Sequence, residues 1–177
     1  MSKVMKIISC ISVIFTIMFL VLFNQFKYEI FYTLVITFGT IAYHFLMRLA
    51  VGYSINFIYK NKFNYKRRWF QVSNFEMKIY RKLNVKKWKN KMPTYVPDSF
   101  DISKHSLEEI LMTMCQSEVV HEIIVLFSFV PLFAIILFGS AWAFIITSIL
   151  SAAFDLMFVI IQRFNRNRII RIKSKVQ

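Results

Sequence analysis

Four apolar stretches, each long enough to cross a lipid bilayer, constrain the fold of this 177-residue chain more than any other feature. A membrane-spanning helix needs about 20 mostly apolar residues. Hydrophobic residues make up 57% of the sequence, more than an ordinary soluble domain contains. We therefore expect an all-α integral membrane protein with four transmembrane helices in two hairpins, at about 7–26, 30–58, 119–138 and 141–161.

Two short outer turns join the predicted helices into hairpins. The first turn spans residues 24–29, and the second lies at Gly139-Ser140, where glycine permits the backbone reversal of a tight connection. The sequence therefore divides into a first transmembrane hairpin over 1–58, a basic segment over 59–118, a second hairpin over 119–161 and a basic tail over 162–177.

Positive charge is concentrated outside these spans. The chain holds 23 Lys and Arg against 9 Asp and Glu, a net charge of +14, and cations are costly inside hydrocarbon. The outer turns carry only Lys27, whereas the central segment and the tail carry many Lys and Arg. Because cytoplasmic loops carry this excess, we expect a multi-pass protein of the cell membrane with both termini cytoplasmic.

The start of the chain and its two cysteines argue against a secreted protein, a lipoprotein and a disulfide-linked or metal-binding protein. Lys3 and Lys6 before an apolar run could indicate a secretory signal, with Cys10 as a lipoprotein cysteine. Too few apolar residues precede Cys10 and no small-residue cleavage site follows, so we expect the first helix to be retained as an anchor. Cys10 and Cys115 form no paired motif, and we expect neither a disulfide framework nor a metal site.

The basic segment contains a predicted amphipathic helix near residues 74–83. It begins at an S-x-x-E capping box, Ser73 to Glu76, which satisfies the free N–H groups of a helix start. Apolar side chains at four-residue spacing lie among basic ones, a pattern typical of a helix on anionic lipid. The apolar residues are Phe75, Ile79 and Leu83, and the basic residues are Lys78, Arg81 and Lys82.

A second capping box, Ser106 to Glu109, predicts another helix start. The residues that follow form one apolar stripe, at Leu107, Ile110, Leu111 and Met114. No helix breaker intervenes before Pro131, so we expect this helix to continue into the third span.

Basic and aromatic residues lie together at 65–70 and 86–89, a composition that can indicate nucleic-acid binding. Beside a bilayer, Lys and Arg with Trp and Phe more naturally bind anionic lipid, with the rings at the level of the head groups. We therefore expect anionic membrane lipids as partners and no nucleic acid. The sequence gives no indication of an oligomeric state.

Glu118 and His121 lie three residues apart, on one face of the third predicted helix. They share the stripe of Leu107, Leu111 and Met114, which we expect to contact protein rather than water. A His polarised by a carboxylate can remove a hydroxyl proton near neutral pH. The alternative is that both side chains extend toward the membrane interface without a catalytic role.

The fourth predicted helix ends in cations and amides that suit phosphates or anionic head groups, although the positive-inside rule alone also places Arg here. Equal steps back from the Gly139-Ser140 turn bring Glu118 level with Ile161 and His121 level with Phe158. The cluster should therefore meet Glu118 and His121 at the cytoplasmic membrane boundary. Its members are Gln162, Arg163, Asn165, Arg166 and Arg168.

Three ionisable residues, His44, Arg48 and Asp155, lie inside predicted spans. Lipid exposure of such groups costs about 2.5–3.5 kcal/mol on insertion scales, so we expect Asp155 to pair with Arg48 or His44. The pair could be functional or purely structural. Asp155, Gln162 and Arg166 lie near one face of the fourth helix, which predicts an inward polar seam.

Three separated polar blocks resemble the glycosyl-diaponeurosporenoate acyltransferase family, which esterifies a sugar on a carotenoid pigment. The similarity covers about residues 69–171, with the blocks in the same order and at similar spacing. The blocks are Asn74-Phe75-Glu76 followed by residues 81–89, then Glu118-x-x-His121, then residues 162–168.

The resemblance implies transfer of a fatty acyl group to a hydroxyl of a membrane glycolipid at the cytoplasmic leaflet. His121 would act as the general base and Glu118 would orient it. From the chemistry of acyl transfer we expect an acyl-CoA-type donor as co-substrate and no other cofactor. Its phosphates would be held by the basic cluster, namely Gln162, Arg163, Asn165, Arg166 and Arg168 with Lys87, Trp88 and Lys89.

Two other classes of function stay open. A non-enzymatic membrane partner, such as an immunity or assembly subunit, would use the basic segment only to bind anionic lipid, and replacing Glu118 or His121 would leave its function intact. Another lipid-modifying enzyme, such as a membrane methyltransferase or reductase, would also use a polar seam but would depend on a cofactor.

Overall fold

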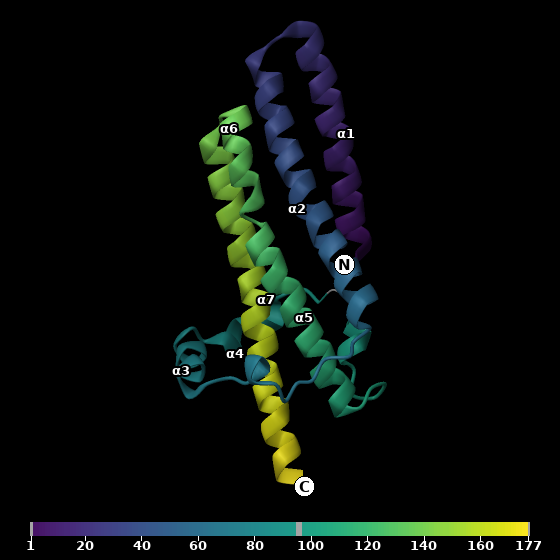
Figure 1. Ribbon diagram of the computed structural model, residues 1–177, viewed down its shortest axis with the longest axis vertical. Helices are drawn as coiled ribbons and strands as arrows, with labels where there is room; N and C mark the ends of the chain where they lie inside the picture. Colours follow the sequence, from purple (N-terminus) through teal and green to yellow (C-terminus); the bar gives the residue numbers. More distant parts are fainter. Residues whose placement is uncertain (1, 95–96, 177) are drawn as a thin grey trace. The chain divides into compact units, whose positions relative to one another are not determined.

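The computed structural model describes residues 2–94 and 97–176, and within these ranges all regular secondary structure is helical, without a β-strand (Figure 1). Among the described residues, four helical segments are long and apolar enough to cross a membrane. They are Lys3–Phe26, Glu29–Tyr59, Leu107–Phe138 and Ala141–Ser174. The predicted all-α class with four potential spans is confirmed.

Four long helices form these segments: α1 (Ser2–Phe26), α2 (Glu29–Tyr59), α5 (Leu107–Phe127) and α7 (Ala141–Val176). Short helices lie between α2 and α5, namely η1 (Arg68–Phe70), α3 (Asn74–Lys82), α4 (Val85–Trp88), η2 (Lys89–Lys91) and η3 (Pro97–Phe100). The turn before α7 lies where it was predicted, with Gly139 at φ 65° and Ser140 at φ 45°. Glycine adopts this left-handed conformation without steric cost.

The third span is not one continuous α-helix. α5 ends at Phe127, four residues before Pro131, and the chain continues as η4 (Val130–Ala134) and the single-turn α6 (Ile135–Phe138). A proline ring clashes with the carbonyl of the residue four positions earlier. Pro131 therefore acts on Phe127, and the helix ends there rather than at the proline.

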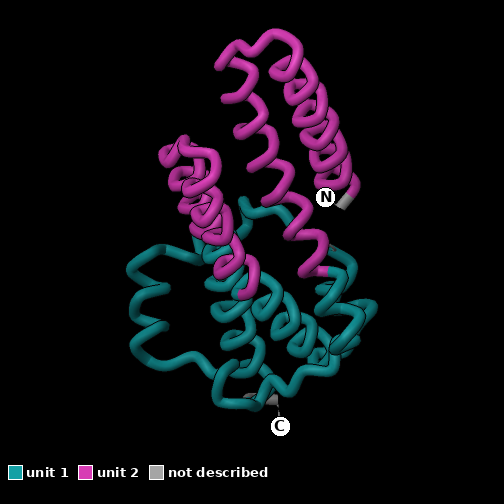
Figure 2. The backbone as a smooth tube through the Cα atoms, turned by 45° about the horizontal axis from the view of Figure 1, so that its top comes forward, with its two compact units in different colours: residues 1, 53–122, 155–177 teal, residues 2–52, 123–154 magenta. Residues whose placement is uncertain are grey.

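The chain divides into two compact units, which we describe separately (Figure 2). Unit 2 comprises residues 2–52 and 123–154, the predominantly apolar parts of both hairpins. The Tyr43 hydroxyl donates to the carbonyl of Phe127 at 2.9 Å. An Arg48 guanidinium nitrogen donates to the Ser151 hydroxyl oxygen at 2.7 Å, and the Ser128 and Ser151 hydroxyls lie 2.8 Å apart. Polar bonds between the hairpins thus satisfy groups that lipid could not.

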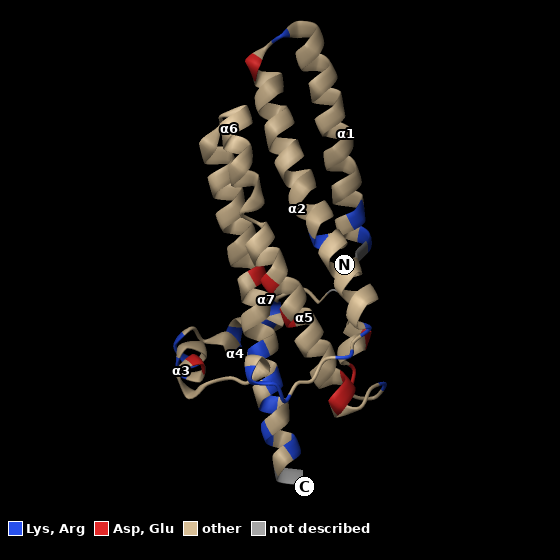
Figure 3. Ribbon diagram, viewed as in Figure 1, with Lys and Arg blue, Asp and Glu red and all other residues tan. Residues whose placement is uncertain are grey.

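Unit 1 comprises residues 53–122 and 155–177 and contains the candidate site. Its apolar centre joins α3 and α4 to α7 through Met77, Tyr80, Val85 and Phe164. Both predicted capping boxes are present: Ser73 and Glu76 bond reciprocally before α3, and Ser106 and Glu109 do so before α5. Figure 3 shows Lys and Arg along the C-terminal part of α7 and on α3 and α4 of this unit.

Candidate functional site

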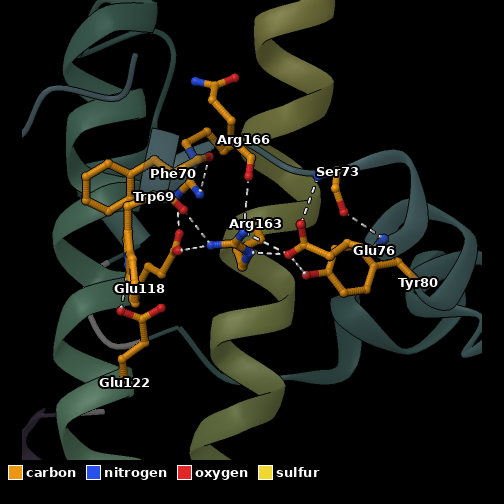
Figure 4. A network of polar contacts seen from close by, with 10 residues as sticks. Trp69, Phe70, Ser73, Glu76, Tyr80, Glu118, Glu122, Arg163 and Arg166 are labelled. Carbon is orange, nitrogen blue, oxygen red and sulfur yellow. Dashed lines mark hydrogen bonds and ion pairs between the residues drawn. The ribbon is translucent and has the colours of Figure 1, made fainter. Parts of the chain in front are cut away.

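A fully buried carboxylate, that of Glu118 on α5, lies at the centre of a network of charged groups in unit 1 (Figure 4). Its Oε1 accepts a hydrogen bond from Arg163 Nη1 at 2.6 Å, and its Oε2 accepts one from Arg166 Nη1. Both arginines lie on α7. A buried carboxylate is stable only when it is paired in this way.

Arg163 and Arg166 use their N–H groups within the protein. Arg166 is fully buried, and its Nε and Nη2 atoms donate to the carbonyl of Phe70 at 3.0 and 2.7 Å. Arg163 donates to the carbonyls of Trp69 and Gln71 as well as to the Glu76 carboxylate. A guanidinium has five N–H donors, and those of Arg163 are all engaged.

These bonds change the interpretation of the two arginines. We expected them to hold donor phosphates, but an incoming phosphate would have to displace Glu118, Glu76 or the carbonyls of residues 69–71. We therefore assign Arg163 and Arg166 a structural role, in which they hold the segment 69–71 and α3 against α5 and α7.

Glu76 connects α3 to this network. Burial would raise the pKa of Glu76, but hydrogen bonds from Ser73 and the charge of Arg163 outweigh it and lower the pKa. The Tyr80 hydroxyl donates to Glu76 at 3.2 Å. Burial and the neighbouring Glu76 charge raise the pKa of Tyr80 to about 12, so this hydroxyl stays protonated at neutral pH.

His121 lies one turn beyond Glu118 on α5, and its bonding partner is Asp155 of α7. The His121 Nδ1 atom lies 2.8 Å from Oδ1 of the buried Asp155. The imidazole also stacks on the Phe158 ring, with centroids 4.6 Å apart and planes within 8°. With Nδ1–H donated to the carboxylate, Nε2 carries the lone pair that a general base needs.

The predicted contact between Glu118 and His121 is therefore wrong, because Arg163 and Arg166 hold both oxygens of Glu118. The predicted register is confirmed, since His121 lies against Phe158. The polar seam on α7 is also confirmed: Asp155, Gln162 and Arg166 are all buried. Of the two α5 residues, Glu118 meets the basic cluster, through Arg163 and Arg166, whereas His121 bonds Asp155.

The pairing of Asp155 with Arg48 or His44 would join the two units, and it stays a prediction. Within unit 2, Arg48 Nη1 donates to the carbonyl of His44 at 2.9 Å, and Nη2 donates to Ser151. Arg48 thus bonds inside the apolar unit, to the backbone carbonyl of His44 and to Ser151.

Lys89 and Arg168 form a basic pair that is at least partly exposed. Lys89 Nζ donates to the Asn165 side-chain oxygen at 2.6 Å, and Arg168 is exposed. Burial and the charges of Arg168 and Lys86 lower the pKa of Lys89. Converging positive charges of this kind suit an anion. Of the other predicted residues, Lys87 is exposed, whereas Trp88 packs on the apolar centre and donates to the Leu83 carbonyl at 3.0 Å.

Several members of the network were not predicted from the sequence, among them Glu122 and the carbonyl acceptors of residues 69–71. Glu122, which directly follows His121 in the sequence, accepts a hydrogen bond from the Trp69 indole at 3.1 Å. The Phe70 carbonyl accepts two bonds from Arg166. Glu122 was recognisable as a charged residue well inside an apolar helix, but a carbonyl acceptor leaves no trace in the sequence.

Comparison with known proteins identifies a matching family. Residues 66–175 match the family model described as glycosyl-4,4'-diaponeurosporenoate acyltransferase. This range covers more than half of the chain. It contains α3 and α5, the charged network around Glu118, and the basic pair of Lys89 and Arg168. No curated protein and no solved structure matches the chain. Within residues 2–94 and 97–176, no group of three or more His, Cys, Asp or Glu side chains could hold a metal ion.

Proposed function

Because the chain belongs to the glycosyl-4,4'-diaponeurosporenoate acyltransferase family, we propose that it esterifies a hydroxyl of a glycosylated membrane lipid, of the glycosyl carotenoid kind, with a fatty acyl group. The family indicates acyltransferase activity in carotenoid biosynthesis. The acceptor class, the donor and the residue roles given below are our proposal.

The hydrogen bond between His121 and Asp155 carries this proposal. Acyl transfer to a hydroxyl needs a base that removes the hydroxyl proton as the new bond forms. His121 supplies such a base at Nε2, while the Asp155 carboxylate fixes the orientation of the ring and stabilises the imidazolium that forms. The stacking on Phe158 restricts the ring further.

In the proposed reaction, the acceptor hydroxyl gives its proton to His121 Nε2 and its oxygen bonds to the carbonyl carbon of an acyl thioester. The carbon–sulfur bond then breaks. The proton on Nε2 passes to the departing thiolate, so that an ester and a free thiol leave and the imidazole is regenerated. Direct transfer of this kind requires no covalent intermediate on the protein.

An acyl-CoA-type molecule is the proposed donor, because Lys89 and Arg168 offer accessible cations for its phosphates. Lys89 is oriented by Asn165 on α7. We place the reaction at the cytoplasmic leaflet with both termini cytoplasmic. The distribution of charge supports this placement. Lys and Arg are abundant near those ends of the potential spans that belong to unit 1, and they are scarce in the outer turns.

Lipid mass spectrometry tests this function. Membranes from cells that make the wild-type chain and a glycosyl carotenoid acceptor should contain an acylated product, and membranes with His121→Ala should lack it. His105→Ala is a matched control, since His105 lies in an exposed turn before α5. A product that persists unchanged with His121→Ala would remove His121 from the mechanism, and no product from the wild type would refute the function.

A further inference from the structure

The short helix α3 has two faces, and protein covers one of them. Met77 and Tyr80 are buried against Val85 and Phe164. On the opposite face, Phe75 is 72% exposed and Leu83 is 49% exposed, with Ile79 also exposed. Within the described part of the chain, the apolar outer face therefore has no protein cover.

Basic side chains border this outer face. Lys78, Arg81 and Lys82 are all exposed and lie beside the apolar stripe, as helical spacing requires. Exposed aromatic and aliphatic residues flanked by cations are suited to the boundary between phosphate head groups and acyl chains. A bilayer with anionic head groups matches both the apolar stripe and the charge.

The face is held in place by the fold. Ser73 and Glu76 cap the helix start, and the Glu76 carboxylate also lies 2.8 Å from Nη2 of Arg163. Arg163 in turn bonds Glu118 on α5. The orientation of α3 is thus fixed by the charged network around Glu118, which holds the outer face in place within unit 1.

We propose that the outer face of α3 binds the surface of an anionic bilayer, with Phe75, Ile79 and Leu83 inserted at the head-group boundary. Lys78, Arg81 and Lys82 bind the lipid phosphates. This contact with the bilayer surface does not depend on the proposed acyl transfer. Through Glu76 and Arg163, it would also stabilise the position of α5 residues next to His121 in membranes rich in anionic lipid.

The test places a fluorophore on the proposed surface of the full chain. Phe75→Cys in a Cys10→Ser background is labelled with the environment-sensitive dye NBD, because the remaining Cys115 is fully buried. The protein is reconstituted in nanodiscs of phosphatidylcholine with or without phosphatidylglycerol. With phosphatidylglycerol we expect a blue-shifted emission that brominated lipids quench, and a smaller shift and weaker quenching without it.

A matched pair of triple variants distinguishes lipid binding by α3 from a general effect of positive charge. Replacing Lys78, Arg81 and Lys82 by Gln should abolish most of the lipid-dependent shift, whereas the same change at the exposed Lys60, Lys62 and Lys66 should retain it. Two results would overturn the proposal: an emission typical of water in both lipids, or equal shifts in the two triple variants. A shift that appears only after cytoplasmic extract is added would also overturn it, by pointing to a protein partner.

Discussion

The Nδ1 atom of His121 and the Oδ1 atom of Asp155 lie 2.8 Å apart, although 34 positions separate the two residues in the sequence. Asp155 is buried and His121 is partly exposed. This bond joins α5 to α7 and leaves Nε2 of the imidazole for an acceptor hydroxyl. Glu118, one turn earlier, has a different role, because its carboxylate binds Arg163 and Arg166 of α7.

Asp155→Asn tests the positioning role of the carboxylate. Asn can still hydrogen-bond the ring but cannot stabilise an imidazolium, so we expect kcat to fall roughly 10–100-fold, within the range that general-base catalysis contributes. KM should change little, because Asp155 bonds the base rather than the substrate. Steady-state kinetics in nanodiscs measure both. Asp98→Asn, at an exposed residue, is the control, and an unchanged kcat for Asp155→Asn would contradict the assignment.

Arg166→Leu tests the structural role of the buried arginine. The change leaves Glu118 with Arg163 alone, and breaking a buried ion pair by removing one partner costs about 3–5 kcal/mol. We expect a loss of that order in the free energy of unfolding, measured by denaturant titration in detergent. Arg168→Leu removes an exposed cation from the same helix and should stay within about 0.5 kcal/mol of wild type. Equal stability of the two variants would refute this assignment.

Local patterns in the sequence were sufficient for much of the fold. The four apolar stretches, the capping boxes at Ser73 and Ser106, and the turn at Gly139 each depend on residues close together in the chain. Counting from that turn also placed His121 beside Phe158.

The bonding partners within the site were harder to predict. Helical spacing puts Glu118 and His121 on one face, yet each of them bonds side chains of α7. The acceptors for Arg163 and Arg166 include carbonyls of residues 69–71, in a short irregular segment without periodicity. The sequence could therefore indicate a polar site but not which arginines remain accessible.

Lys89→Gln and Arg168→Gln test the proposed donor site. A hydrogen bond to a charged group contributes about 1.5–3 kcal/mol, so each change should raise KM for an acyl-CoA donor roughly 10-fold or more while kcat stays near wild type. Lys104→Gln is a control, because Lys104 is exposed and bonds Asp98 outside this cluster. Unchanged KM values in both test variants would place the donor elsewhere.

Acid stability tests the contact of Glu76 with Arg163. The pKa of Glu76 is lowered below its ordinary value of 4.5, so the stability that its ionised form contributes is present above that value. This contribution is lost as the pH falls through the lowered pKa. Wild type should therefore lose thermal stability more steeply below pH 4.5 than Glu76→Gln does. Parallel curves for the two proteins would show that the contact adds no stability.

His121 is the proposed general base, and chemical rescue tests this role directly. Purified His121→Gly in nanodiscs is supplied with acyl thioester and glycosylated acceptor, and ester formation is followed with and without added imidazole. We predict a rate at least roughly 100-fold below wild type, as expected for loss of a general base, and an increase with imidazole concentration that wild type does not show. A His121→Gly variant that forms ester at the wild-type rate without imidazole would contradict the account.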